Sequence, residues 1–467
     1  MSIVLGIISP HPPIIIPEVG KEEVKKVSET INALAKAAEM ICDFDPEVVI
    51  FITPHGIVFQ DAIAITVEPN LHGDFTQFGA GQVNLSCNND LRLAEEIIST
   101  ASLHNITVVP LDRHLAGKYG VKVDLDHGIT VPLYYLKKQG LSCPIVPISI
   151  SFFSYEDLFR FGTLIQKAVG NLGRRAVIVA SGDLSHCLTL NAPAGFHPEG
   201  KEFDLTLVNL LKKGDIKGIF QLDKNLIENA GECGLRSIIM MLGAFDGYEK
   251  KTDILSYEGP FGVGYLVADV SPGEFSPEKT LVEELYRIRR EAVQKIRSQE
   301  SEPVALARRT LETYVQKGEI GDPPSDLSEL FSKQAGVFVS IKKHGQLRGC
   351  IGTILPVQSN VAKEIMENAI SAGTRDPRFE PVGPEELDDL IYSVDILSPP
   401  EPISGIKQLD PHKYGVIVKH GNKSGLLLPN LEGIDSPQEQ VDIAMRKAGI
   451  RQGEPVEMER FEVVRYY

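Results

Sequence analysis

The sequence predicts an α/β domain with a mixed central sheet flanked by helices, followed by a smaller α+β domain. In the first part of the chain, short runs of β-branched residues alternate with helix-like segments, as in sheets that helices cover. A turn-rich segment, SPGEFSP at 271–277, interrupts this alternation. The residues beyond it combine helical segments with hairpin-like strands. At 467 residues, the chain is also longer than one ordinary domain.

The first domain is expected to cover residues 1–270. Its strand candidates are continuous apolar runs, which are typical of strands buried on both faces of a sheet. Its helix candidates repeat apolar residues with a period of 3.6. We expect strands at 3–9, 48–53, 62–67, 145–151, 176–180 and 262–270, and helices at 21–40, 92–100, 155–169, 203–211 and 235–244.

Residues 271–302 are expected to form a linker. Glu, Arg and Lys dominate its second part, which predicts a charged, solvated helix at 278–297. The second domain is expected at 303–467, because strand and helix patterns resume there. Its helix is expected at 304–315, its hairpin strands at 336–342 and 347–354, and its later strands at 391–397 and 415–419.

The composition excludes two classes of partner. A net charge of −16 argues against nucleic acid and against an anionic membrane surface, since both attract clustered Lys and Arg. No segment approaches the roughly 20 apolar residues of a membrane span. The six cysteines are scattered and form no CxxC pair, which fits reduced thiols. We therefore expect a cytoplasmic protein that acts on a small molecule, and a homo-oligomer is left open.

Two histidines directly follow apolar strand candidates. The run at 3–8 ends in Ser-Pro-His-Pro, which contains His11, and the run at 48–52 ends in Thr-Pro-His-Gly, which contains His55. Ligands bind at the carboxyl ends of strands in open α/β sheets, because the loops there converge on one crevice. A single histidine after a strand is commonly structural, but two in the same context favour a metal site. We expect His11 and His55 to be metal ligands.

A catalytic metal ion needs a further protein ligand and an open position for substrate. The best candidates are the neighbours Glu232 and Cys233, just before an apolar helix. Glu232 would complete a two-histidine, one-carboxylate set, which suits Fe(II) and oxygen chemistry. Cys233 would make the site softer and would favour zinc or copper. Alternatively, Glu232 only complements the positive end of the helix.

Two more histidines are candidates for acid–base work, because imidazole titrates near neutral pH. His186 ends the loop Ser-Gly-Asp-Leu-Ser-His, which follows the strand candidate at 176–180. His127 follows Asp126, whose charge is close enough in sequence to act on the imidazole. The alternative for both is a buried histidine bonded to backbone.

Together, these motifs resemble the class III extradiol dioxygenase superfamily, to which the Memo proteins also belong. The resemblance spans roughly residues 1–270 and rests on Ser-Pro-His-Pro at 9–12, Thr-Pro-His-Gly at 53–56, Asp-His-Gly at 126–128, Ser-Gly-Asp-Leu-Ser-His at 181–186 and Gly-Tyr-Leu-Val at 264–267. In the dioxygenases it implies Fe(II) held by His11, His55 and a late glutamate, with His186 as the base that acts on a catechol-like aromatic diol. In Memo proteins the late position is a cysteine, and catechol cleavage is not the expected role.

The second domain resembles the AMMECR-type domain over roughly residues 303–467. The matching segments are Leu-Arg-Gly-Cys-Ile-Gly at 347–352, Asp-Pro-Arg-Phe at 376–379 and Gly-Leu-Leu-Leu-Pro at 425–429. A fusion of these two domains is similar to a system in which Memo-like, AMMECR-like and radical SAM proteins occur together. The resemblance therefore implies a radical SAM partner.

Cys350 is the candidate reactive residue of the second domain. Arg348 lies two positions before it on a predicted strand, so both side chains share a face, and the cation would favour a nucleophilic thiolate. His420 is a candidate base if the fold brings it close. Asp376 and Arg378 either form a turn ordered by an ion pair or belong to the same pocket. The alternative is a small buried cysteine with no chemical role.

Three functions are consistent with these residues. The first is an iron-dependent dioxygenase of the extradiol type. The second is a Memo-like metalloenzyme that acts on a non-catechol substrate. The third is a binding or scaffold protein with a vestigial site, against which the four motif histidines in compact loops argue.

Overall fold

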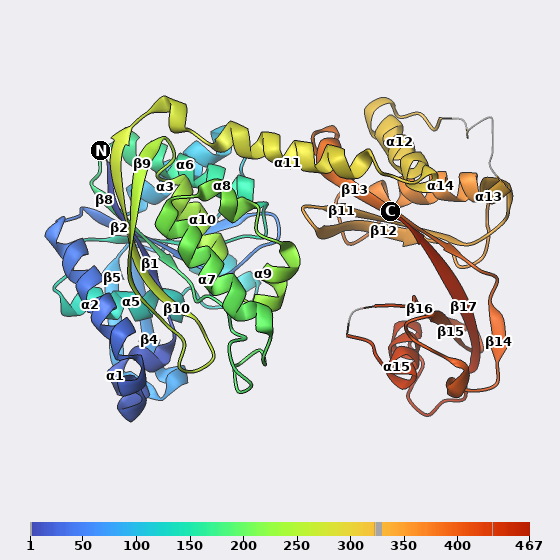
Figure 1. The fold of residues 1–467 in the computed structure, drawn as a ribbon, viewed down its shortest axis with the longest axis horizontal. Coiled ribbons are helices and arrows are strands. Elements are labelled where there is room, and N and C mark those ends of the chain that lie inside the picture. Colours follow the sequence, from blue (N-terminus) through green and yellow to red (C-terminus); the bar gives the residue numbers. More distant parts are fainter. Residues whose placement is uncertain (1, 322, 324–328, 432) are drawn as a thin grey trace. The chain divides into compact units, whose positions relative to one another are not determined.

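A computed structural model describes residues 2–321, 323, 329–431 and 433–467 (Figure 1). The chain forms two compact units that divide between Tyr286 and Arg287. No helix among these described residues is long and apolar enough to cross a membrane.

An eight-stranded mixed sheet forms the centre of the first unit. The strand order is β6-β3-β7-β2-β8-β1-β10-β9, and the four central strands β7, β2, β8 and β1 are mutually parallel. Strands β4 and β5 form a separate antiparallel hairpin. The strands are β1 Ile3–Ser9, β2 Val48–Thr53, β3 Ile63–Thr66, β4 Asn70–Phe75, β5 Ala80–Asn88, β6 Val108–Leu111, β7 Ile145–Ser149, β8 Ala176–Ser181, β9 Tyr248–Glu258 and β10 Tyr265–Phe275.

Helices cover both faces of this sheet (Figure 1), as the continuous apolar strands predict. In β2, Val48, Ile50 and Ile52 belong to the core that α3, α6, α7 and α10 share, whereas Val49 and Phe51 belong to the core that α2 and α5 share. The helices are α1 Pro17–Gly20, α2 Ser28–Asp43, α3 Leu91–Leu103, α4 Arg113–Lys118, α5 His127–Lys138, α6 Tyr155–Leu172, α7 Pro198–Lys213, α8 Ile216–Phe220, α9 Lys224–Ala230 and α10 Leu235–Gly243. The predicted α/β fold with a mixed sheet is confirmed.

The second unit is built on antiparallel strands. Its sheet has the order β12-β11-β13-β17-β15-β16, and β14 pairs with β17. One core lies between β11, β13 and helices α12 and α14, and another lies between β15, β16 and α15. The strands are β11 Val337–Lys343, β12 Gln346–Gly352, β13 Leu390–Leu397, β14 Glu401–Ile403, β15 Tyr414–His420, β16 Lys423–Leu427 and β17 Glu457–Tyr466. The helices are α12 Glu302–Lys317, α13 Glu329–Ser332, α14 Val361–Thr374 and α15 Pro437–Ala448, and the division between the units falls within α11, Val282–Arg297.

Two predictions about the segment between the domains are wrong. Strand β10 continues through most of the turn-rich segment to Phe275, because residues 271, 272 and 275 pair with β9. The charged helix α11 is also not fully solvated, since Leu285 is buried in the core of the first unit. Turn-forming residues can continue a strand where a neighbouring strand supplies hydrogen bonds. Here that neighbour is β9, which the sequence pattern did not predict.

Helices α6 and α10 approach closely through glycine. A Cβ atom at Gly162 of α6 would lie 2.1 Å from the carbonyl oxygen of Met240 in α10, and one at Gly243 would lie 2.0 Å from the carbonyl oxygen of Phe159. Glycine lets the two backbones touch at these positions. The contact holds α10, and the loop before it, against the sheet.

We expect Gly162→Ala to destabilise the protein by about 1–3 kcal/mol, because the added methyl group overpacks the contact between α6 and α10. Alanine by itself stabilises a helix relative to glycine by about 0.5–1 kcal/mol, so a loss of stability on this substitution has to come from packing. Gly170→Ala in the same helix is the matched control, since its Cβ would meet no atom within 4 Å. Urea unfolding measures both, and equal effects would contradict the packing argument.

Candidate metal centre

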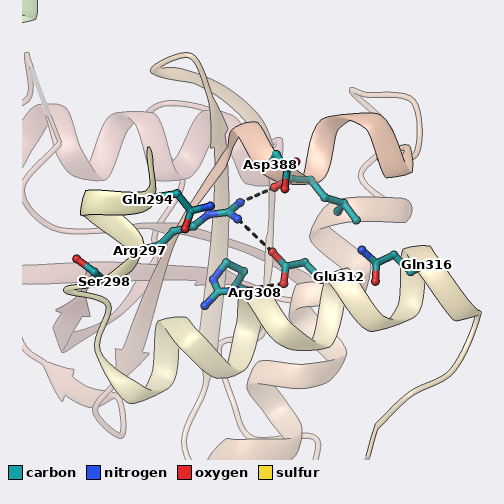
Figure 2. Close-up of a pocket in the computed structure, with 8 residues that line it drawn as sticks. Gln294, Arg297, Ser298, Arg308, Glu312, Gln316 and Asp388 are labelled. Carbon is teal, nitrogen blue, oxygen red and sulfur yellow. Dashed lines mark hydrogen bonds and ion pairs between the residues drawn. The ribbon is translucent and has the colours of Figure 1, made fainter. Parts of the chain in front are cut away.

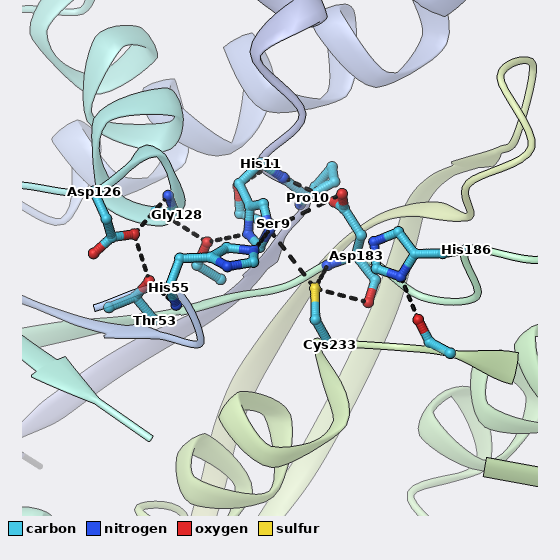
Figure 3. A network of polar contacts seen from close by, with 12 residues as sticks. Ser9, Pro10, His11, Thr53, His55, Asp126, Gly128, Asp183, His186 and Cys233 are labelled. Atoms are coloured by element: carbon cyan, nitrogen blue, oxygen red, sulfur yellow. Dashed lines mark hydrogen bonds and ion pairs between the residues drawn. The ribbon is translucent and has the colours of Figure 1, made fainter. Parts of the chain in front are cut away.

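The loops that carry the motif residues meet at one edge of the sheet. His11 follows β1, His55 follows β2, and Asp183 and His186 follow β8, which lies between those two strands. The three strands are parallel and in register, with Ser9 beside Ser181 and Ile52 beside Ala180. Residues that are far apart in sequence therefore lie in one small region (Figure 3).

Three ligand atoms converge in this region. The Nε2 atoms of His11 and His55 lie 2.9 Å apart, and Sγ of Cys233 lies 3.7 Å from Nε2 of His11. All three donor atoms lie within 4.8 Å of one another. A tetrahedral ion with ordinary bond lengths would place two nitrogens about 3.3 Å apart, and a nitrogen and a sulfur about 3.6 Å apart. The His11–His55 and His11–Cys233 distances lie within about 0.4 Å of these values, so the donor set suits a metal ion.

The structure brings Cys233, and not Glu232, to the two histidines. The carboxylate of Glu232 accepts a hydrogen bond of 2.6 Å from the backbone N–H of Leu235, in the first turn of α10. In this structure Glu232 has the alternative role of complementing the helix terminus, and its role as the third ligand stays a prediction. The two side chains are adjacent in sequence and point in different directions, which a sequence pattern does not resolve.

A close backbone contact sets the position of Cys233. A Cβ atom at Gly182 would lie 2.1 Å from Cα of Gly234, so glycine is required where the two loops touch. The carbonyl oxygen of Asp183 accepts hydrogen bonds from the backbone N–H groups of Cys233 and Gly234, at 3.2 and 2.9 Å. The loop after β8 therefore holds the cysteine beside His11.

Burial keeps the clustered imidazoles neutral. It holds the pKa of His11 well below its ordinary value, and the neighbouring imidazoles of His55 and His127 add to the effect. Burial also lowers the pKa of His55 to about 4, assisted by His127 and His186. Burial and the nearby Asp183 raise the pKa of the Cys233 thiol well above its ordinary value. Neutral imidazoles are ready to bind a metal ion, whereas the thiol has to release its proton when it binds one.

His127 lies directly against the two ligand histidines. Its ring stacks on that of His55 at a centroid distance of 4.2 Å and meets the ring of His11 edge-on at 5.2 Å. Asp126 does not act on this ring as predicted, because it is the N-cap of α5. Its carboxylate accepts hydrogen bonds from Gly128 N–H and Thr53 Oγ1, both at 2.7 Å. Burial alone lowers the pKa of His127.

His186 is held by backbone carbonyl groups at the end of α9. Its backbone N–H donates to the carbonyl oxygen of Ala230, and its Nδ1 contacts the carbonyl oxygen of Gly231. The loop that carries His186 is fixed by Asp204, which accepts hydrogen bonds from Ser185 N–H at 2.8 Å and Tyr257 O–H at 2.7 Å. The sequence analysis did not predict a role for Asp204, because no sequence motif relates α7 to the loop that carries Ser185.

The second unit gathers some of its predicted residues around Cys350. Asp376 accepts a hydrogen bond of 2.9 Å from the backbone N–H of Cys350 and pairs with Arg378 at 2.6 Å. This ion pair lowers the pKa of Asp376 below its usual range. The hydroxyl of Ser340 donates to Sγ of Cys350 at 3.2 Å.

Two other predictions for the second unit are wrong. Arg348 does not act on Cys350 as a free cation, because Glu386 binds its guanidinium through two hydrogen bonds of 3.0 and 2.8 Å. Strands β11, β13 and β17 separate His420 on β15 from Cys350 on β12, and His420 bonds instead to the carbonyl oxygen of Pro455. A nucleophilic role for Cys350 stays a prediction.

A polar cavity of about 350 Å³ also lies in the second unit (Figure 2). Arg297 and Arg308, which line it, already pair with Glu312 at 3.4 and 3.1 Å, and Arg308 also pairs with Glu300 at 2.8 Å. These carboxylates offset the charges, so we assign the cavity no chemistry.

The protein is thus an α/β protein in which two histidines at the ends of parallel strands, and a thiol beside them, form a candidate metal centre. Residues 5–268, more than half of the chain, match the family model described as the catalytic LigB subunit of aromatic ring-opening dioxygenase. The chain belongs to this family. Residues 304–466 match the AMMECR1 model. The fusion inferred from the motifs is therefore confirmed.

Several proteins are similar to the chain over its whole length or over a part of it. A protein of Clostridium acetobutylicum is 44% identical over 459 residues, which cover 98% of this chain and 97% of the relative. A protein of Thermotoga maritima is 54% identical over 166 residues, or 35% of this chain and 95% of the relative. A solved structure of an uncharacterized protein from Pyrococcus horikoshii is 33% identical, with a TM-score of 0.33, and covers 35% of this chain and 88% of that one.

The lowered histidine pKa values predict an acid-sensitive fold. Between pH 6.5 and about 4, the unfolded chain binds a proton at His55 that the folded protein excludes. The contribution of His55 to the free energy of unfolding is therefore fully present above pH 6.5 and is lost as the pH is lowered through this window. Burial raises the pKa of Asp183 to about 6, which acts in the opposite direction but is common to the wild type and a His55 variant. We expect His55→Gln to lose less stability than the wild type in urea unfolding with a chelator from pH 7.5 to 4.5, and parallel curves would contradict this assignment.

Proposed function

We propose that the first domain is a metal-dependent enzyme whose ion is held by His11, His55 and Cys233. The observation that carries this proposal is the convergence of two imidazole nitrogens and one thiol at the carboxyl ends of parallel strands. A thiolate with two imidazoles favours zinc or copper over Fe(II), for which a carboxylate is the usual third ligand. The substrate is proposed to be a small, non-catechol molecule that reaches the ion through an oxygen atom.

A bound ion would polarise such an oxygen or activate a water molecule. The chain itself supplies two imidazoles for proton transfer. The Gly231 carbonyl oxygen can only accept a hydrogen bond, so Nδ1 of His186 carries the proton and Nε2 is left as a base. His127, whose pKa burial lowers, is the second proton acceptor beside the ligands.

A second candidate function is extradiol cleavage of a catechol-like diol by Fe(II) and O2. The match of residues 5–268 to a ring-opening dioxygenase family favours it. The position of Glu232 does not, since its carboxylate is bound at the start of α10. A radical SAM protein as partner stays a prediction.

Metal analysis of protein purified without oxygen tests the proposal. We expect stoichiometric zinc or copper in the wild type, because the three donors converge on one point. The metal should be lost in His11→Ala and in Cys233→Ala, and retained in Glu232→Gln. Cys187→Ala is the matched control, since Cys187 is buried in the same region but lies outside the donor group.

The opposite pattern would favour the second candidate. Iron that disappears in Glu232→Gln and persists in Cys233→Ala would contradict our assignment of the third ligand. Formation of the ring-opened product from catechol, together with oxygen uptake, by the iron-loaded wild type would then establish ring cleavage as the reaction.

A further inference from the structure

A short chain of hydrogen bonds lies behind the metal-binding face of His11. Nδ1 of His11 lies 2.9 Å from Oγ of Ser181, the last residue of β8. The same hydroxyl donates to the carbonyl oxygen of Gly128, at 2.5 Å, in the first turn of α5. Ser181 is fully buried and His11 is only 2% exposed, so bulk water does not compete for these bonds.

The direction of each bond follows from what the atoms can do. A carbonyl oxygen only accepts, so the single proton of the Ser181 hydroxyl points to Gly128. The hydroxyl oxygen then accepts from His11, which requires the imidazole proton to be on Nδ1. Nε2 of His11 is left with its lone pair directed at Nε2 of His55 and Sγ of Cys233.

We propose that Ser181 is a positioning residue that selects the tautomer of His11 in which Nε2 is free to bind the metal ion. This inference rests on the proposed function for its consequence, metal affinity, but the tautomer itself is a property of the metal-free protein. A partner on the second imidazole nitrogen orients a ligand histidine and strengthens metal binding. Ser181 fills that position with an uncharged hydroxyl.

The turn whose carbonyl oxygen accepts the hydrogen bond from Ser181 also orders His55. The backbone N–H of Gly128 and the hydroxyl of Thr53 both donate to Asp126, and Oγ1 of Thr53 accepts a hydrogen bond of 3.2 Å from the backbone N–H of His55. A Cβ atom at Gly128 would lie 2.3 Å from Oγ1 of Thr53, so a side chain there would disrupt this arrangement. The first turn of α5 thus connects both ligand histidines.

Nitrogen NMR of the full chain, labelled at histidine and kept free of metal at pH 7.5, tests the tautomer directly. His11→Ala identifies the His11 signals by their disappearance. We expect a protonated Nδ1 and an unprotonated Nε2 in the wild type, and a mixture of tautomers in Ser181→Ala. A wild-type His11 protonated on Nε2 would overturn the inference.

Metal affinity, measured by competition with a chromogenic chelator using Zn²⁺, tests the consequence. We expect Ser181→Ala to bind Zn²⁺ about 10- to 100-fold more weakly, as for other partners of ligand histidines. Ser181→Thr keeps the hydroxyl and should restore most of the affinity. Ser9→Ala is the matched control, because Ser9 is equally buried at the same register on β1 but donates to the carbonyl oxygen of Pro10.

The outcomes separate this inference from the proposed function. If His11→Ala abolishes Zn²⁺ binding while Ser181→Ala binds like Ser9→Ala, the metal site stands and the role of Ser181 is wrong. If His11→Ala binds Zn²⁺ like the wild type, the proposed function fails, and the NMR result alone decides the tautomer. Circular dichroism confirms that each variant is folded.

Discussion

The parallel pairing of β2, β8 and β1 is the constraint on which the rest of the site depends. Strands that run in one direction release their loops at one edge, so three motifs that are distant in sequence become neighbours. The close contact between Gly182 and Gly234 completes this arrangement, because it holds the loop with Cys233 against the loop after β8. Sheet topology positions the residues, and local loop structure orients them.

Burial then determines the state of the residues that the sheet assembles. Several imidazoles in a volume with little water cannot all carry charge, since their mutual repulsion is poorly screened. The observed contacts are consistent with neutral rings, as Nε2 of His55 and Nε2 of His11 face each other at 2.9 Å. Such a group gives up hydration in the folded protein, and a bound cation would offset this loss.

The sequence predicted the fold class and most of the residues near the site, because strand ends and motif histidines are local features. His11 and His55 follow apolar strands that are readily recognised. The choice between Glu232 and Cys233 depends on the path of a loop, which no local pattern encodes. The same limit applies to Arg348, whose partner Glu386 lies in a distant segment, and to His420, which the order of the strands separates from Cys350. Ser181 begins the motif at 181–186, yet its proposed role depends on the carbonyl group of Gly128 in α5.

The adjacency of Glu232 and Cys233 has a consequence for how such sites diversify. The Gly182–Gly234 contact fixes the loop so that the thiol faces the histidines and the carboxylate faces a helix. A displacement of this loop by one residue would exchange a soft donor for a hard one without changing either histidine. Metal preference is then a property of backbone placement as much as of ligand identity. Within a family, selection could therefore change the chemistry of the site by adjusting a pair of glycines.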